Sequence, residues 1–236
     1  MALTNDLLSC CAQSVARDLW NAAQRNQQWS QPFTTAFSIL VAAAVSKELT
    51  AKPVIVYAAP HSGHTTGLLK KHIFSSKNWS EVRASRKGVR HFHSEWMVDI
   101  TCVEPESKKK ETPILAVESE ACVNHDTKYT FAQTGYAWDF CKLVHFNCPR
   151  LLFVAAVNRS QSDRRSPSHR RLDELGESLE ACRADYAGVL DNRSVGLILL
   201  PSTSRDAAFG RVGVSNGGRP FVFESLPSLW RGAEGA

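Results

Sequence analysis

Acidic side chains interrupt two otherwise apolar stretches of the chain. One stretch reads Ser94-Glu95-Trp96-Met97-Val98-Asp99-Ile100-Thr101, and the other reads Ile114-Leu115-Ala116-Val117-Glu118-Ser119-Glu120. Because side chains alternate between the two faces of a strand, Glu95 and Asp99 share one face, as do Glu118 and Glu120. Carboxylates on adjacent strands repel one another unless one is protonated or a cation lies among them. Oxygen ligands without His or Cys suit Mg²⁺ or Mn²⁺, which can activate water for attack on a phosphate.

A hairpin would bring these acids together. Alternating apolar and polar residues predict a strand over residues 91–103, a polar turn over 104–111 and a second strand over 113–120. The alternative is an edge hairpin with a solvated acidic face, which Lys or Arg at neighbouring positions would normally offset. The acids instead interrupt apolar runs, so we expect them to form a metal-binding site.

Helices and strands alternate along the rest of the chain. Apolar periodicity predicts helices over about 2–25, 34–49, 68–74, 126–146 and 172–189, and strands over 54–57 and 195–200. The continuous apolar run 151–157 predicts a strand covered on both faces. Loops are expected at 60–67 and 158–171, and loop or short strands near the C-terminus. Four aromatic residues are expected to pack in the core or against the sheet: Trp79, Trp96, Tyr136 and Trp138.

This alternation predicts an α/β fold with a mixed central sheet flanked by helices. The chain has 236 residues, which suits a single domain spanning 1–236. The helix over 2–25 would precede its core, and a helix and strand extension over 172–225 would follow it.

The two strands and the segments around them resemble the PD-(D/E)XK nuclease superfamily, which has the restriction-endonuclease-like fold. That family carries an Asp on one strand and an E-x-K pair on the next, within an αβββαβ core. Here Asp99 matches the strand Asp, and Glu118-Ser119-Glu120 stands at the E-x-K position. The resemblance covers about residues 33–157 and continues through the next helix, with Asp139-Phe140-Cys141-Lys142-Leu143, and through the strand 151–157.

Two residues depart from the family pattern. Glu120 stands where the family has Lys, as in the minority of restriction enzymes with an E-x-E arrangement, and Val98 stands where it has Pro. In some members the Lys has migrated to the following helix. Lys128 and Lys142 are therefore the candidates for a displaced catalytic lysine.

The resemblance implies a Mg²⁺- or Mn²⁺-dependent endonuclease that hydrolyses phosphodiester bonds in DNA. Asp99 and Glu118 would bind one or two metal ions, and Glu120 would add a ligand or position the attacking water. Glu95 would support the second metal or the water. The alternatives are a catalytically inactive nuclease-fold protein and an unrelated protein whose basic face binds nucleic acid or a protein partner. Titration with Mn²⁺ would separate them: no metal bound at Asp99, Glu118 and Glu120, with Lys or Arg side chains paired to these acids, would favour the binding proteins.

Basic charge is concentrated in two segments, residues 70–93 and 158–171, of a chain whose net charge is +5. Such concentration favours a polyanion partner, with DNA preferred and RNA as the alternative; two solvated loops would give the same pattern. A homodimer is also expected, because cutting both strands of a duplex usually takes two sites. The candidate nucleic-acid-binding residues are Lys70, Lys71, Arg83, Arg86, Lys87, Arg90, Arg164, Arg165, Arg170 and Arg171.

Seven cysteines at irregular spacings, none in a CxxC pair, predict reduced thiols and a cytoplasmic protein. The longest apolar stretch, residues 33–45, is shorter than the roughly 20 residues of a membrane span, so no membrane partner is expected. A zinc site is a weak alternative, because its candidate ligands do not match a zinc knuckle. Those ligands are Cys122, His125, Cys141, His145 and Cys148.

Overall fold

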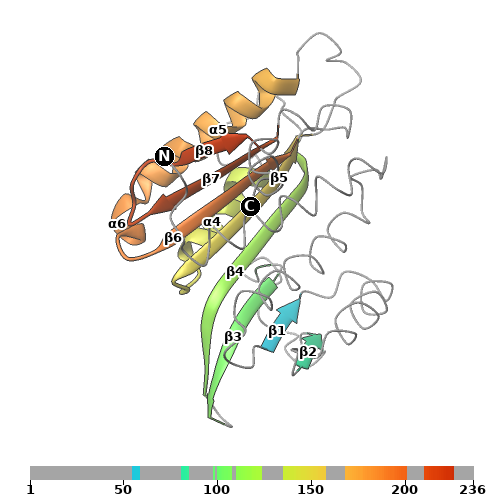
Figure 1. Ribbon diagram of the computed structural model, residues 1–236, viewed down its shortest axis with the longest axis vertical. Helices are drawn as coiled ribbons and strands as arrows, with labels where there is room; N and C mark the ends of the chain where they lie inside the picture. The colour runs from blue at the N-terminus through green and yellow to red at the C-terminus, as the bar shows by residue number, and fades with distance from the viewer. Residues whose placement is uncertain are drawn as a thin grey trace, which may run out of the picture.

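The computed structural model describes residues 55–58, 81–84, 98, 100–107, 110–123, 135–157, 168–200 and 210–225. The predicted helices over 2–25, 34–49 and 68–74 lie outside these residues. The described strands form one sheet in the order β2-β1-β3-β4-β5-β6-β7-β8 (Figure 1). They are β1 (Ile55–Ala58), β2 (Glu81–Ala84), β3 (Ile100–Ser107), β4 (Lys110–Val123), β5 (Arg150–Val157), β6 (Ser194–Leu200), β7 (Arg211–Asn216) and β8 (Val222–Ser225).

The sheet is mixed, with its parallel strands at the centre. β3 runs antiparallel to both β1 and β4, whereas β5 runs parallel to both β4 and β6. The two parallel connections contain the helices α4 (Gly135–His145), α5 (Ser168–Asp185) and α6 (Ala187–Leu190). β7 and β8 extend the sheet by antiparallel pairing. The α/β class and the mixed sheet predicted from the alternation of elements are therefore confirmed.

Both long helices pack on one face of the central strands. Alternate residues of β5 and β6 join apolar residues of α4 and α5 in a single buried cluster, which includes Phe140, Phe153, Leu175 and Leu197. Residues 151–155 are all completely buried, which confirms that β5 is covered on both faces. The edge-to-face contact between the Phe140 and Phe153 rings, with centroids 5.5 Å apart, holds α4 onto β5.

The β3–β4 hairpin extends further toward its turn than predicted, and residues 91–97 and 99 of the predicted first strand lie outside the described residues. Residues 104–107 and 110–112, which the sequence assigns to a polar turn, belong to the two strands, and Ser107 pairs with Lys110. Pro113 lies within β4, at a register shift between Cys102 and Val103 of β3, rather than opening the strand. The turn end of this hairpin extends beyond the strands that flank it. Its backbone groups therefore need no partner in a third strand, so Pro and polar side chains are tolerated there.

Several other boundaries differ from the sequence-based prediction. The strand β2 was not predicted, and α5 begins at Ser168, so Arg170 and Arg171 lie in a helix and not in a loop. α5 also ends at Asp185, before the predicted end of the helix, and the short helix α6 follows. Residues 211–216 and 222–225 form regular strands, because each pairs with a neighbour along its whole length.

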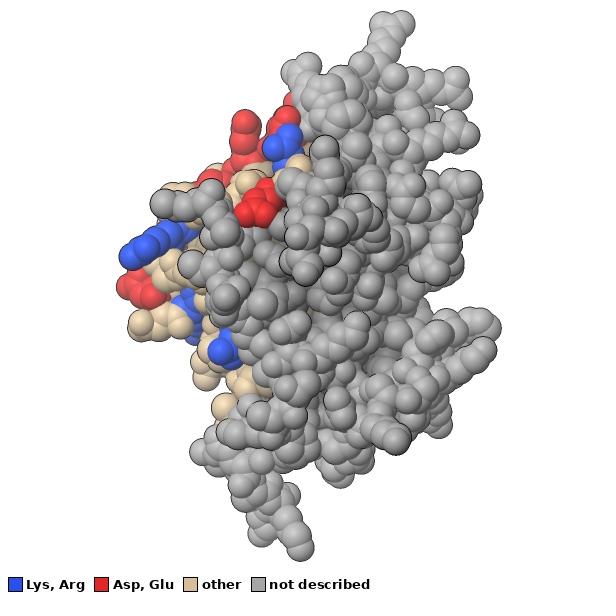
Figure 2. All heavy atoms as spheres, in the orientation of Figure 1, with Lys and Arg blue, Asp and Glu red and all other residues tan. Residues whose placement is uncertain are grey.

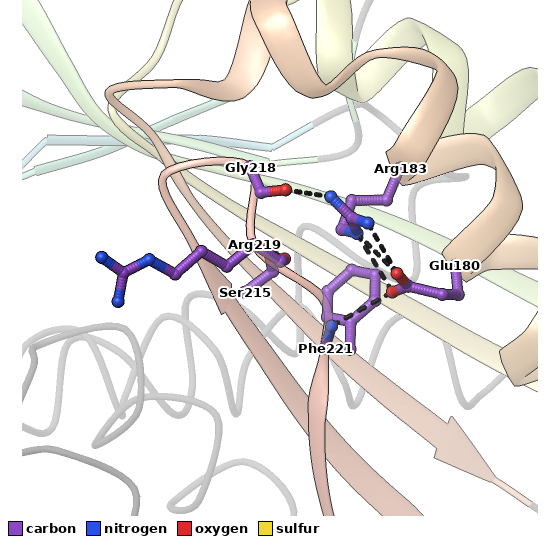
Figure 3. A network of polar contacts seen from close by, with 6 residues as sticks. All are labelled: Glu180, Arg183, Ser215, Gly218, Arg219 and Phe221. Atoms are coloured by element: carbon purple, nitrogen blue, oxygen red, sulfur yellow. Dashed lines mark hydrogen bonds and ion pairs between the residues drawn. The ribbon is translucent and has the colours of Figure 1, made fainter.

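A polar network holds the end of α5 against the β7–β8 connection (Figure 3). The guanidinium of Arg183, which is 5% exposed, donates to both carboxylate oxygens of Glu180 and to the carbonyl of Gly218. The same carboxylate accepts a hydrogen bond of 3.1 Å from the backbone N–H of Phe221. Gly217 and Gly218 have φ angles of 57° and 68°, a conformation that suits glycine in a tight hairpin turn.

Candidate active site

Glu118 is a buried carboxylate in the middle of the sheet. It lies on β4, between β3 and β5, where it pairs with Phe153 of β5. The residue is only 4% exposed. The alternative of a solvated acidic face on an edge hairpin is therefore wrong for Glu118, because β4 has strands on both sides. A carboxylate at this depth requires a cation or strong hydrogen-bond donors.

Lys142 of α4 supplies that cation. Its Nζ lies 2.7 Å from Oε1 of Glu118 and 2.7 Å from Oδ1 of Asp139. The crossover between β4 and β5 packs α4 against the sheet through Phe140 and Leu143, and the long Lys142 side chain reaches from the helix to Glu118. Asp139 and Lys142 are three residues apart, so they lie on the same side of the helix.

The three side chains form a compact charged cluster that is largely closed to solvent. Side-chain exposure is 11% for Lys142, 5% for Glu118 and 15% for Asp139. Burial by itself lowers the pKa of Lys142, but hydrogen bonds and charge from Asp139 and Glu118 outweigh it and raise the pKa above its ordinary value of 10.5. Lys142 is therefore a charged ammonium at neutral pH, with two carboxylates beside it.

Asp139 has no role predicted from the sequence. Its only signal is the three-residue spacing from Lys142 on an amphipathic helix, a spacing that occurs on most helices. The sequence did identify Lys142 as one of two candidates for a catalytic lysine displaced to the following helix. The other, Lys128, lies outside the described residues.

The remaining predicted acids are not placed by the structure. Glu95 and Asp99 lie outside the described residues. The backbone of Glu120 is described, and this residue pairs with Ala155 in the same unbroken register that pairs Glu118 with Phe153. Its side chain is not described. Among the described residues, no three His, Cys, Asp or Glu side chains gather closely enough to hold a metal ion.

The candidate zinc ligands whose side chains are described do not form a metal-binding group either. Cys122 is described only by its backbone, and His125 lies outside the described residues. The His145 ring meets the ring of Tyr186 edge-to-face, with centroids 5.2 Å apart. Burial raises the pKa of the Cys148 thiol to about 11, so this thiol is protonated and neutral at neutral pH.

Most of the predicted basic surface also lies outside the described residues. Arg83 is on β2, and Arg170 and Arg171 are in the first turn of α5, with side chains that are not described. The other candidates are not placed: Lys70, Lys71, Arg86, Lys87, Arg90, Arg164 and Arg165. Where Figure 2 shows described residues, around α5 and α6, acidic and basic side chains lie interspersed.

No helix in the described part of the chain is long and apolar enough to cross a membrane. Comparison of the chain with protein-family models, with curated proteins and with solved structures finds no match. Any functional assignment therefore rests on the chain's own residues and their geometry.

Proposed function

We propose that the protein is a metal-dependent nuclease of the PD-(D/E)XK type, with an E-x-E strand motif and a catalytic lysine displaced to the following helix. One observation carries the proposal. The Nζ atom of Lys142 lies 2.7 Å from Oε1 of Glu118, although the two residues are 24 positions apart in the chain. Lys142 is thus the lysine that replaces the one missing from position 120.

The order of the central elements supports this assignment. β1, β3 and β4 pair antiparallel in succession, and α4 then connects β4 to the parallel strand β5. The core of the proposed family has the same succession of three strands, a helix and a strand. β2 would be an addition to that core at the outer edge of the sheet.

The proposal requires Asp99 to lie beside Glu118. Its chain neighbour Ile100 pairs with Val117, which is the chain neighbour of Glu118. These neighbours support an active site formed by Asp99, Glu118 and Glu120, with Glu95 as the supporting acid.

Carboxylate oxygens suit Mg²⁺ or Mn²⁺, because these hard cations prefer oxygen ligands, and Glu118 offers a carboxylate that is only 4% exposed. Asp99, Glu118 and Glu120 would hold the ion, which when bound supplies a water of lowered pKa and neutralises charge on the phosphate. Lys142 would donate hydrogen bonds to the attacking water or to a phosphate oxygen. Asp139 would keep the ammonium charged and hold it in position through their 2.7 Å contact.

The proposed substrate is DNA, with RNA as the alternative. The basic residues of segments 70–93 and 158–171 would contact phosphates, and such contacts weaken as salt rises. A homodimer would place two sites on a duplex.

The pairing of Lys142 with Glu118 also favours a second candidate. A lysine that neutralises the acid without a metal would suit a catalytically inactive nuclease-fold protein that binds nucleic acid or a protein partner. The two candidates differ in whether a divalent cation competes for Glu118.

Cleavage of supercoiled plasmid by the full chain tests the proposal. We expect nicking or linearisation in Mg²⁺ or Mn²⁺ and none in EDTA. Glu118→Gln, Asp99→Ala and Lys142→Met should each abolish it, whereas Glu177→Gln, at an exposed acid of α5, should retain it. If the wild type does not cleave but still binds the plasmid, the inactive protein is the correct assignment. Cleavage that survives Asp99→Ala would refute the active site.

A further inference from the structure

Trp138 is an exposed aromatic residue on an otherwise well-buried helix. It is 47% exposed, whereas Tyr136 is 7% exposed and Phe140 is completely buried. The sequence-based expectation that Trp138 packs in the core is therefore wrong. Two residues rotate a helix by about 200°, so burial of Phe140 turns Trp138 to the opposite side. Single exposed apolar residues are common, so exposure alone has no functional meaning.

The exposure of Trp138 is relevant to function because this residue lies next to Lys142 and Asp139 on the helix. It precedes Lys142 by four residues, so the two side chains are neighbours on the helix surface, about 6 Å apart along the axis. It is also adjacent in sequence to Asp139. Trp138 thus borders the charged cluster of Glu118, Asp139 and Lys142.

Trp138 lies one helical turn closer than Lys142 to the start of α4, the end of the helix that follows the carboxyl end of β4. α4 begins at Gly135, after the carboxyl end of β4, so Trp138 belongs to the first turn of the helix. Ligands of open α/β sheets bind outside the carboxyl ends of the strands. The indole is therefore on the approach to Glu118, and not at the far end of α4, where Arg193 donates to the carbonyls of Val144 and Phe146.

We propose that Trp138 is a stacking platform for an unpaired nucleobase, and that the substrate of this site is single-stranded or locally unpaired nucleic acid. This role rests on the proposed nuclease function, because it assumes that a phosphate lies at Glu118 and Lys142. The base of that nucleotide or of the next one would then reach the indole. Bases inside a duplex are already stacked on their neighbours, so only an unpaired base gains from a new aromatic face.

Binding of one short oligonucleotide, as a single strand and as the duplex with its complement, tests this role. Binding is measured by fluorescence anisotropy in Mg²⁺ on a Glu118→Gln background, which prevents cleavage, and kcat and KM are measured in the active protein. Trp138→Ala and Trp138→Leu both remove the aromatic face, and Leu keeps the apolar bulk in case Ala disturbs the fold. Trp138→Phe retains an aromatic face. Val189→Ala, at another exposed apolar residue, is the matched control.

Stacking of a base on an aromatic side chain contributes about 1–3 kcal/mol, which corresponds to roughly 5- to 150-fold in affinity. We expect a loss in this range for the single strand with Ala and Leu, appearing in KM more than in kcat. Phe should recover most of it, and duplex binding should change little. Equal binding by all variants, or an equal loss for single strand and duplex, would overturn the stacking role while leaving the nuclease proposal intact. If the parent protein binds neither form, both proposals fail together.

Discussion

Replacement of Lys142 by Met tests whether the ion pair holds α4 on β4. The substitution keeps an unbranched side chain but removes the Lys142 ammonium from beside two carboxylates, Glu118, which is 4% exposed, and Asp139. At 2.7 Å, an attraction between unit charges in an effective dielectric constant of 20 is about 6 kcal/mol, and desolvation offsets part of it. Removal of one partner from a buried pair typically costs 3–5 kcal/mol. Because Lys142 is 11% exposed, we expect about 2–4 kcal/mol here.

Urea denaturation of the full chain, followed by circular dichroism, measures this cost in a double-mutant cycle of Lys142→Met and Glu118→Gln. We expect the double variant to lose less stability than the sum of the single variants, because Gln leaves no uncompensated charge. Asp173→Asn is the matched control. It breaks the pair between Asp173 and Arg211, whose side chains are 45% and 40% exposed, and should cost less than about 1 kcal/mol.

The effect of pH provides an independent check. Because the pKa of folded Lys142 lies above 10.5, its stabilising contribution is fully present below pH 10.5 and is lost as the pH rises through the folded value. The stability cost of Lys142→Met should therefore be the same at pH 7 and pH 9 and should shrink only as the pH rises above 10.5. Additive single variants, with Lys142→Met within about 0.5 kcal/mol of the wild type, would refute the reasoning.

Other predictions concern packing and reactivity. Gly176→Ala should stabilise α5 by about 0.5–1 kcal/mol in urea denaturation, because a Cβ there would meet its nearest neighbour at an ordinary 3.5 Å. Gly213→Ala should destabilise by about 1–3 kcal/mol, because its Cβ would lie 2.6 Å from the Phe223 ring; a neutral result would mean that the ring moves freely. Arg183→Met should cost about 2–4 kcal/mol, since it removes the cation beside the half-buried Glu180 carboxylate and the donor to the Gly218 carbonyl, and an unchanged urea midpoint would contradict this. Burial raises the pKa of Cys182 to about 12, so iodoacetamide at pH 8 should modify it only in unfolded protein, as peptide mass spectrometry would show; rapid labelling of the folded chain would contradict its burial.

Local patterns in the sequence determined most of the central elements. The apolar run at 151–157 predicted β5, and the alternation around Glu118 predicted β4. Periodic apolar residues predicted the described part of α4 and most of α5. These patterns are reliable because a buried element must repeat its apolar residues at its own geometric period.

The sequence also identified Glu118 and Lys142 individually, but only the tertiary structure paired them. Their contact joins residues 24 positions apart, and it depends on how far α4 is rotated against β4. That rotation is set by the packing of Phe140 and Leu143 in the core, which involves residues of several strands at once. Asp139 enters the cluster, and Trp138 faces solvent, for the same reason.

The length of the β3–β4 ribbon was likewise decided by structure rather than by sequence pattern. Charged residues and Pro105 predicted a turn over 104–111, yet backbone pairing continues to Ser107 and Lys110. Cross-strand hydrogen bonds do not depend on side-chain type, so a polar ribbon gives no apolar period from which it could be predicted. The chain alone therefore determined the chemistry available to the site, and the packing of α4 on the sheet decided which of those groups meet, because contact between distant residues depends on the whole core.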